Sequence, residues 1–439
     1  MEIFKAYDIR GIYGTELIDS DAYNLGRAFV LFIGKRPKIV IGRDGRLSSP
    51  KLFSLLKKGI NDQGGDVVDI GISTTPMMYF ADCFLKTSGG IIVTASHNPK
   101  EYNGFKLVLK DAFPVSEQTG LKEIKKIVDN IASYPLAKKK GSSTSKSILT
   151  DYAKCTLSDF DVKNFNFKIG IDTANGAAGI AIDPILKNTG LKVFHINKKV
   201  DGSFPSHEAD PLKIKNLKPL SELIKKKKLD LGISFDGDGD RVMFMDEKGR
   251  LIPSDIIIAI IGDVLGEKVL CDFRCSRIIK DCLKDKTTVS RVGHSFIKEI
   301  MKKNDITFGG EYSGHFYLNE KCCFEAPFFA LFKILEQMNF SQKKFSEVAD
   351  PYMKYFHSGE INFKIKDDPK KIIAKIESKY KKGKILKQDG LRVDFENWWF
   401  LVRTSNTEPV LRLIVEAETK KLLDEKKGEI EKIILKKGD

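Results

Sequence analysis

Three short apolar runs alternate with two longer stretches between residues 38 and 94. The runs are KIVIG (Lys38–Gly42), VVDIGI (Val67–Ile72) and GIIVT (Gly90–Thr94). The stretches between them, Pro50–Asn61 and Thr75–Leu85, repeat apolar residues at helical spacing. The order predicts strand, helix, strand, helix, strand, which is typical of a largely parallel sheet covered by helices.

The same alternation restarts twice further along the chain. Lys168–Asp172 (KIGID) opens a second unit, and the apolar helix Ile256–Leu265 opens a third. The other elements expected there are the strands Val193–Ile196, Leu231–Phe235, Lys268–Cys271 and Thr288–Val292, and the helices Pro219–Lys228, Ser276–Leu283 and Ser295–Lys303. We therefore expect three α/β units of similar layout.

The pattern changes near Tyr355–Gly359. A helix over Pro369–Tyr380 is followed by three expected strands and a charged terminal helix, which predicts an α+β unit. A polar linker, Lys138–Ser147 (KKKGSSTSKS), and a turn at Gly249–Pro253 supply the other two boundaries. The expected domains are residues 1–145, 146–252, 253–357 and 358–439: three similar α/β domains with mixed or parallel sheets, and a C-terminal α+β domain.

Charge and hydropathy narrow the class of protein. The 439 residues include 74 Lys and Arg and 59 Asp and Glu, which gives a net charge of +15. Such a charge is compatible with a polyanionic partner, and also with a lysine-rich surface that binds nothing in particular. The longest apolar run, Ile256–Ile261, is far shorter than the roughly 20 residues that span a bilayer. The N-terminus, MEIFKAYDIRG, has no apolar stretch, so we expect no secretory leader.

Cysteine usage predicts reduced thiols. The chain has seven cysteines, an odd number that does not suggest a disulfide framework. Neither Cys271 with Cys275 nor the adjacent Cys322 and Cys323 has a partner pair at zinc-binding spacing. We expect no structural zinc, and a cytoplasmic protein.

A serine follows the third apolar run directly, in Thr94-Ala95-Ser96-His97-Asn98-Pro99. Parallel sheets bind ligands at the carboxyl ends of their strands, where this serine would lie. His97 could exchange a proton with Ser96 or contact a phosphate oxygen, and Lys106 follows ten residues after the serine. A polar loop that caps a helix is the alternative interpretation.

Three aspartates, Asp236, Asp238 and Asp240, alternate with glycines after another expected strand. Glycine lets the backbone wrap around a cation, and Mg²⁺ prefers oxygen ligands, so these carboxylates can converge on one ion. An EF-hand is excluded, because its twelfth position, Glu247, would require a loop through the apolar residues that precede it. A solvated acidic turn is the alternative.

Two further loops combine hydroxyl side chains with charged ones. GGEYSGH (residues 309–315) offers donors and acceptors in a glycine-rich backbone that can approach a polyol closely. RTSNTEP (residues 403–409) combines a guanidinium with hydroxyl and amide groups, which suits a phosphate. An ordinary turn without a ligand is the alternative for each.

Taken in this order, the four loops resemble those of the α-D-phosphohexomutases, and within that family the phosphomannomutase/phosphoglucomutase branch. The resemblance runs from FKAYDIRG (residues 4–11) to the Arg403 loop, and includes VDGSFP (residues 200–205). It implies four domains around a central cleft, with one α/β topology shared by the first three.

The resemblance also implies roles for individual residues. Ser96 is a phosphoserine in the active enzyme, and Mg²⁺ lies on one of its phosphate oxygens and on the three aspartates. The catalytic residues implied are Ser96, His97, Lys106, Arg241 and His315, with Lys106 and His315 as acid/base candidates. The substrate-binding residues implied are Tyr7, Arg10, Arg274, His294, Glu311, Ser313, Arg403, Ser405, Asn406 and Thr407.

The activity implied is that of an isomerase. Phosphorylated Ser96 would donate its phosphoryl group to the free hydroxyl of a hexose 1- or 6-phosphate, and the resulting hexose 1,6-bisphosphate would reorient and return a phosphoryl group from its other end. Mannose and glucose are the expected sugars. A phosphoglucosamine mutase is the alternative, although such enzymes typically carry glycine in place of Asn406 and glutamine in place of Tyr312. Arg274 and the segment Glu325-Ala326-Pro327 depart from the pattern of relatives, which leaves the choice between mannose and glucose open.

Two other classes fit single features. A metal-dependent phosphatase could use Asp236 as its nucleophile, but it would make no use of Ser96 or Arg403. A nucleic-acid-binding protein would fit the net charge, but the lysines at 138–140 and 225–228 are not interleaved with aromatic residues. We expect a phosphorylated hexose as partner, no nucleic acid and no membrane, and a monomer or weak homo-oligomer.

Overall fold

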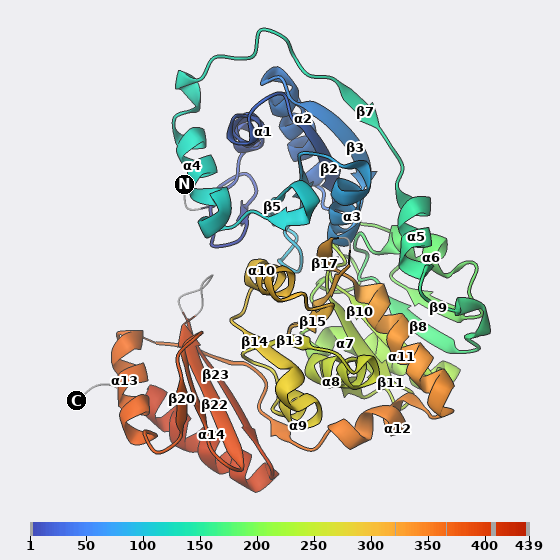
Figure 1. Cartoon of the computed structure of the whole chain (residues 1–439), viewed down its shortest axis with the longest axis vertical. Helices are drawn as coiled ribbons and strands as arrows, with labels where there is room; N and C mark the ends of the chain where they lie inside the picture. The colour runs from blue at the N-terminus through green and yellow to red at the C-terminus, as the bar shows by residue number, and fades with distance from the viewer. Residues whose placement is uncertain (1–2, 321, 366, 405–409, 436–439) are drawn as a thin grey trace.

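The computed structural model describes residues 3–320, 322–365, 367–404 and 410–435. Within these residues lie four sheets, which follow one another along the chain (Figure 1). The first three mix parallel and antiparallel strands and carry helices, and the fourth is antiparallel. The expected fold class, three α/β domains and a C-terminal α+β domain, is confirmed.

The first sheet contains the strands and helices that residues 38–94 predict. Its order is β1-β5-β4-β2-β3-β7, with β6 beside β5; β2, β3, β4 and β7 run parallel, and β5 is antiparallel to its neighbours. The strands are β1 (Ile9–Ile12), β2 (Lys38–Arg43), β3 (Asp66–Ile72), β4 (Gly89–Val93), β5 (Tyr102–Leu109), β6 (Phe113–Pro114) and β7 (Ser143–Ser145), and the helices are α1 (Asp19–Ile33), α2 (Ser49–Asp62), α3 (Thr75–Leu85) and α4 (Lys122–Asp129).

Strand β2 is buried on both faces, which explains its uninterrupted apolar run. Successive side chains of a strand point to opposite faces of the sheet. Ile39 and Ile41 pack in the core that α1 and α2 share, whereas Val40 packs in the core that includes α3. The α3 core continues through the second and third sheets, so the first three sheets share apolar contacts.

The polar segment 138–147, expected as a linker, contains the short strand β7. Figure 1 shows it at the outer edge of the first sheet, where it pairs in parallel with β3. The Val67 N–H donates to the carbonyl of Ser142 at 2.8 Å, while the three β7 side chains are exposed. Backbone pairing therefore holds this strand, and a run of exposed polar residues has no apolar alternation that would reveal it.

The second sheet has the order β12-β11-β10-β8-β9, in which β8, β9 and β10 run parallel. The helix expected to begin at Pro219 begins instead at Ile214. Proline favours the first turn of a helix, but here Leu217 and Leu220 are buried on either side of it and anchor an earlier turn. The elements are β8 (Lys168–Asp172), β9 (Lys192–Ile196), β10 (Leu231–Phe235), β11 (Val242–Asp246), β12 (Leu251–Ile252), α5 (Leu149–Leu157), α6 (Gly179–Leu186) and α7 (Ile214–Lys227).

The third sheet has the order β14-β13-β15-β16-β17, with β13 parallel to both of its neighbours. Its helix α10 begins at His294, and its β15 leads into the glycine-rich loop at 309–315. The elements are β13 (Val269–Asp272), β14 (Thr287–Ser290), β15 (Phe308–Gly310), β16 (Phe316–Asn319), β17 (Cys323–Glu325), α8 (Ser254–Leu265), α9 (Ile278–Leu283), α10 (His294–Asn304), α11 (Pro327–Ser341) and α12 (Phe345–Ala349).

The fourth sheet lies to one side of the other three in Figure 1 and has its own core. Arg277 links the third domain to the fourth, because its guanidinium donates to the carbonyls of Phe395 and Trp398. No helix in the described ranges is both long and apolar enough to cross a bilayer. The elements are β18 (Phe356–His357), β19 (Ile361–Lys364), β20 (Lys384–Leu386), β21 (Leu391–Asp394), β22 (Trp398–Thr404), β23 (Val410–Ala417), α13 (Pro369–Lys379) and α14 (Lys420–Leu435).

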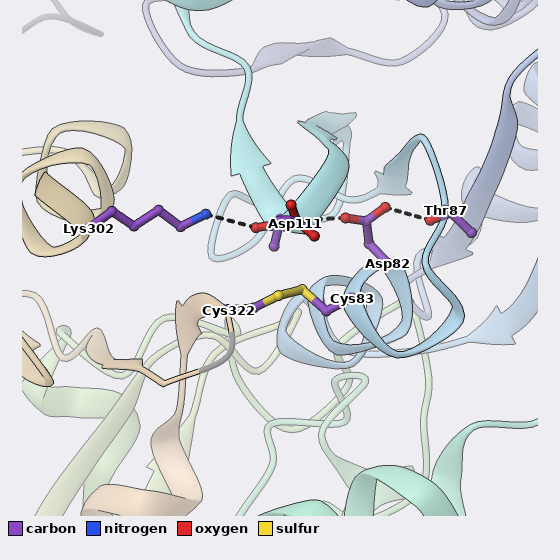
Figure 2. The surroundings of a disulfide bond; sticks show 7 residues. Asp82, Cys83, Thr87, Asp111, Lys302 and Cys322 are labelled. Carbon is purple, nitrogen blue, oxygen red and sulfur yellow. Dashed lines mark hydrogen bonds between the residues drawn. A yellow bond between two sulfur atoms is a disulfide. The ribbon is translucent and has the colours of Figure 1, made fainter. Parts of the chain in front are cut away.

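A disulfide joins Cys83 of α3 to Cys322 beside β17, so the expectation that all thiols are reduced is wrong (Figure 2). The two cysteines are 239 residues apart in sequence but 6.6 Å apart between Cα atoms. Spacing along the chain could not reveal this pair, because the packing of the first domain against the third brings it together. Beside the bond, the Lys302 Nζ donates to the carbonyl of Asp111, a second contact between the same two domains.

We expect Cys83→Ser to lower the apparent melting temperature by several degrees. A bond that closes so long a loop restricts the unfolded chain, which contributes about 2–5 kcal/mol to the free energy of unfolding. Thermal unfolding of the variant, and of the wild type with and without dithiothreitol, measures the effect. Cys155→Ser, at an exposed cysteine outside the disulfide, is the control. If non-reducing peptide mapping finds no peptide that joins residues 83 and 322, the disulfide does not form.

Candidate active site

Ser96 lies directly beyond β4, and its side chain reaches the second sheet. Its Oγ donates to Oδ2 of Asp236 at 2.7 Å, and His97 Nδ1 lies 3.3 Å from the same Oγ. The Ser96 N–H donates to Thr94 Oγ1 at 2.8 Å, and the Ser96 φ angle is 50°, in the left-handed region that few residues other than glycine adopt. The serine is 2% exposed. The turn thus aims a buried hydroxyl at the first of the three aspartates.

The three aspartates converge as their spacing predicts. Asp236, Asp238 and Asp240 are buried, and one carboxylate oxygen of each lies within 4.8 Å of the others. Among the described residues, Oδ1 of Asp238 is buried without a hydrogen-bond partner. A Cβ atom on Gly237 would lie 2.5 Å from the Ser96 carbonyl oxygen, so glycine is needed for this close approach. A buried cluster of carboxylates with an unpartnered oxygen fits a hard divalent cation.

The mutual repulsion of the three buried carboxylates also favours a cation at this site. Burial, together with the charges of Asp240 and Asp238, raises the pKa of Asp236 well above its usual value. Lys106 lies 2.8 Å from Asp238 and 2.5 Å from Asp240 and offsets part of this charge. Burial opposes its charged form, but the two carboxylates raise the pKa of Lys106 well above its usual value. Lys106 is therefore held as an ammonium beside the cluster.

The glycine-rich loop at 309–315 reaches the aspartates through His315. Its Nε2 lies 3.4 Å from Asp240, and its Nδ1 lies 3.1 Å from Glu311 and 3.0 Å from Ser313 Oγ. Burial favours the neutral ring, but Asp240 and Glu311 raise the pKa of His315 to about 9. The Arg241 Nε lies 3.4 Å from His315 Nε2. This histidine thus joins the third domain to the aspartates of the second.

Glu311 is fixed by its neighbours. The Tyr317 hydroxyl donates to one of its carboxylate oxygens at 2.7 Å, and the Gly293 N–H donates to the other at 3.1 Å. Burial opposes its ionised form, but hydrogen bonding and charge from His315 lower the pKa of Glu311. Arg274 pairs with Asp272 at 2.7 Å and lies 3.4 Å from Ser313 Oγ. A carboxylate, a hydroxyl and a guanidinium therefore face one region.

The N-terminal residues reach the same region from the first domain. The Tyr7 ring centroid lies 6.0 Å from that of His294, and the Tyr7 hydroxyl donates to the carbonyl of Val292 at 3.4 Å. Arg10 donates to the side chain of Asn98 in the Ser96 loop. Burial and the charge of Lys298 lower the pKa of His294 well below its usual value, so its ring is neutral.

Arg403 lies in a cluster of arginines around Glu360. It is 3.4 Å from Glu360 and 3.6 Å from Asp389, and Glu360 also lies 3.0 Å from Arg412 and 4.0 Å from Arg274. Burial opposes ionisation of Glu360, but Arg274 and Arg403 lower its pKa. The expected partners Ser405, Asn406 and Thr407 lie outside the described residues.

Glu360 and Asp389 were missed by the sequence reasoning, as was Arg46, which contacts the Ser96 loop. Arg46 had a usable signal, because it follows β2 in the same way that Ser96 follows β4, at the carboxyl edge of parallel strands. The two acidic residues have no such signal, since they stand outside any motif. Only the packing of the fourth domain brings them to Arg403.

Comparisons with known proteins agree over the whole chain. Family models of phosphoglucomutase/phosphomannomutase match residues 1–135 (alpha/beta/alpha domain I), 150–249 (domain II), 253–355 (domain III) and 360–433 (C-terminal domain). A phosphomannomutase of Methanocaldococcus jannaschii is 40% identical over 99% of this chain and 98% of its own. A phosphomannomutase/phosphoglucomutase of Pseudomonas aeruginosa is 35% identical over 96% of this chain and 93% of its own.

The crystal structure of a phosphoglucomutase/phosphomannomutase family protein from Burkholderia thailandensis superposes with a TM-score of 0.89, at 28% identity, over 98% of this chain and 96% of that one. Fold and similarity together define a phosphohexomutase, an isomerase that moves a phosphoryl group between the 1- and 6-positions of a hexose. The chain belongs to the phosphoglucomutase/phosphomannomutase family, and the resemblance noted in the sequence is confirmed.

Proposed function

We propose that the chain interconverts the 1- and 6-phosphates of mannose and/or glucose, with Ser96 as the phosphoryl carrier and a hexose 1,6-bisphosphate as the intermediate. The main support for this proposal is the 2.7 Å hydrogen bond from Ser96 Oγ to Asp236, because it brings the hydroxyl beside three carboxylates and a lysine. The glycine-rich loop reaches the same cluster through His315.

A Mg²⁺ ion fits this cluster in our proposal. Asp236, Asp238 and Asp240 would hold it together with a phosphate oxygen on Ser96, and it would neutralise charge on the transferring phosphoryl group. Phosphoserine carries about −1.5 to −2 charges at pH 7, so without a cation it would be repelled by the aspartates. The buried Oδ1 of Asp238, which has no hydrogen-bond partner among the residues that the structure describes, supports this assignment.

The proposed transfer conserves one phosphoryl group and one proton. The Ser96 Oγ–P bond breaks as the free sugar hydroxyl oxygen forms its bond to phosphorus; a neighbouring acid donates a proton to Ser96 Oγ, and its conjugate base takes up the proton of the sugar hydroxyl. In the second transfer, after the bisphosphate has reoriented, Ser96 Oγ forms its bond to phosphorus, and its hydroxyl proton passes through the same kind of acid–base group to the departing sugar oxygen. We assign the proton exchange to Lys106 and His315: both carry a proton at rest, so one of them would donate it to the departing oxygen and then, as the free base, accept the proton of the attacking hydroxyl. His97 and Arg241 lie beside Ser96 and the aspartates.

The remaining side chains hold the sugar and its second phosphate. Glu311 and Ser313 would bind sugar hydroxyls, with Arg274 at their side. The phosphate that does not react would be held by Arg403 together with Ser405, Asn406 and Thr407. Three further residues would line the same cleft: Tyr7, Arg10 and His294. In this proposal the Arg403 site, which lies on a different sheet from the one that leads into the aspartates, serves both orientations of the sugar.

Two measurements test the proposal. Intact-protein mass spectrometry of enzyme incubated with glucose 1,6-bisphosphate should show about 80 Da of added mass, located on Ser96. An adduct on Asp236 would indicate a phosphatase instead. A coupled assay with mannose 1-phosphate, glucose 1-phosphate and glucosamine 6-phosphate identifies the sugar, and turnover of glucosamine 6-phosphate alone would favour the alternative mutase.

We further propose that the enzyme works in the cytoplasm without nucleic acid or a membrane, as a monomer or weak homo-oligomer.

We expect Glu360→Gln to bind inorganic phosphate roughly tenfold more tightly. The carboxylate of Glu360 lies among three guanidiniums and opposes a second anion there, so its removal raises the positive potential at Arg403. Isothermal titration calorimetry with inorganic phosphate measures the change. Glu377→Gln, at a residue of α13 paired with Lys387, is the matched control. Unchanged or weaker phosphate binding in Glu360→Gln would show that Glu360 does not oppose an anion at this site.

A further inference from the structure

A buried arginine beyond the residues assigned above contacts the loop that carries Ser96. Arg46 follows β2 and is 1% exposed. We propose that Arg46 is a positioning residue, whose guanidinium holds the backbone of residues 96–102 so that Ser96 Oγ stays aimed at Asp236. The inference rests on the proposed role of Ser96 as the phosphoryl carrier.

Every N–H of the Arg46 guanidinium has an acceptor. Nη2 donates to the carbonyls of Ser96 and Asn98, both at 2.7 Å. Nη1 donates to the carbonyls of Pro99 at 2.7 Å and Tyr102 at 2.9 Å. The remaining donor, Nε, is used by Asp44. A guanidinium has five N–H donors in a rigid plane, whereas a lysine ammonium has three on a flexible stem. Lysine therefore cannot reproduce this set of bonds.

Asp44 holds the guanidinium in place. Its Oδ2 accepts from Arg46 Nε at 3.1 Å, and its Oδ1 accepts from the Arg46 N–H at 3.0 Å and from Ser49 Oγ at 2.6 Å. Both members of this pair are buried, so water does not compete for the donors. The guanidinium is therefore oriented before it meets the loop.

The carbonyl of Ser96 that Arg46 binds also lies against the aspartate loop. A Cβ atom on Gly237 would lie 2.5 Å from it, so a shift of this carbonyl would push against the backbone between Asp236 and Asp238. Phe204 of the second domain covers the guanidinium, whose carbon lies 5.2 Å from the ring centroid. Arg46 thus lies where the Ser96 loop meets the second domain.

This placement predicts an effect on turnover rather than on substrate affinity. Arg46 uses its donors on backbone carbonyls and Asp44, and the proposed phosphate and sugar residues, apart from the lining residues Tyr7 and Arg10, belong to the third and fourth domains. Phosphoryl transfer requires the reacting atoms in line, and misplacement by about 1 Å can cost about 100-fold in rate. Ser96 holds an unfavourable φ angle, so its backbone needs such support to keep the geometry.

The test compares Arg46→Lys and Arg46→Met with Arg27→Met. Arg27 is a buried arginine of α1 in the same domain, and it donates to Gln63 and to the carbonyl of Tyr134, away from the Ser96 loop. Steady-state kinetics with glucose 1-phosphate and saturating glucose 1,6-bisphosphate give kcat and KM. Thermal unfolding reports the fold, and intact mass reports the phosphate on Ser96.

We expect Arg46→Lys to fold, with kcat lowered about 10- to 100-fold and KM within about threefold of the wild type. Arg46→Met should lose more turnover, while Arg27→Met should lose stability and keep its kcat. A folded Arg46→Lys with wild-type kcat would overturn the inference, as would a change confined to KM. An unfolded Arg46→Lys, or an equal loss of kcat in Arg27→Met, would assign Arg46 a purely structural role. A wild-type enzyme that never carries phosphate on Ser96 would instead defeat the proposed function.

Discussion

Ser96→Ala should lower kcat by roughly 10⁴-fold or more while the protein keeps its melting temperature. The variant lacks the only atom of residue 96 that can carry a phosphoryl group, and removal of a covalent nucleophile costs losses of this order or larger. The serine hydroxyl donates to Asp236 and has a longer contact with His97, and side-chain hydrogen bonds of this kind contribute only about 1 kcal/mol each to stability. A coupled assay with glucose 1,6-bisphosphate supplied measures turnover, and calorimetry measures the melting temperature.

Ser73→Ala is the matched control for that measurement. Ser73 lies just beyond β3, a parallel strand of the same sheet that β2 separates from β4, and it is as deeply buried as Ser96. Its variant should keep wild-type turnover, since the Ser73 hydroxyl makes no hydrogen bond within the described part of the chain. If Ser96→Ala kept full activity with the bisphosphate present, the role of Ser96 as the phosphoryl carrier would be wrong.

Asp238→Asn should lower kcat about 10²- to 10³-fold and raise the Mg²⁺ concentration needed for half-maximal activity at least about tenfold. Charge stabilisation by a bound cation contributes several kcal/mol to such a reaction, and a neutral amide holds the ion more weakly. Asparagine keeps the size of the side chain and an oxygen that can still accept from Thr75 Oγ1, which now donates to Asp238 at 2.6 Å. Turnover measured across a Mg²⁺ titration separates the two effects.

Asp183→Asn is the control for the loss of one negative charge. Asp183 is an exposed residue of the second domain, where it pairs with Lys198. It should leave both turnover and the Mg²⁺ requirement unchanged. An Asp238→Asn enzyme with the wild-type Mg²⁺ requirement would remove Asp238 from the ligand set. In that case Asp236 and Asp240 alone would have to hold the ion, and the equivalent variants at those positions would locate it.

Much of the candidate site was predictable because its residues lie in loops that directly follow buried strands. Ser96 follows β4 and the aspartates follow β10, and such loops gather at one edge of a parallel sheet. The helix over Thr75–Leu85 was likewise predicted with the bounds that the structure has. The start of α7 was not, since the buried Leu217 and Leu220 outweighed the preference of Pro219 for a first turn.

Local sequence by itself indicated many of the strands, several of the helices and the candidate residues for the chemistry, because apolar periodicity and short glycine-rich motifs act over neighbouring residues. Tertiary structure alone decided which distant groups meet. Cys83 meets Cys322, Glu360 meets Arg403, and Arg46 turns its donors onto the Ser96 loop. The first two contacts join segments whose separation along the chain carries no pattern, and the third joins two loops that follow neighbouring parallel strands. They form because the sheets bury a shared apolar surface and so fix the polar groups at their edges.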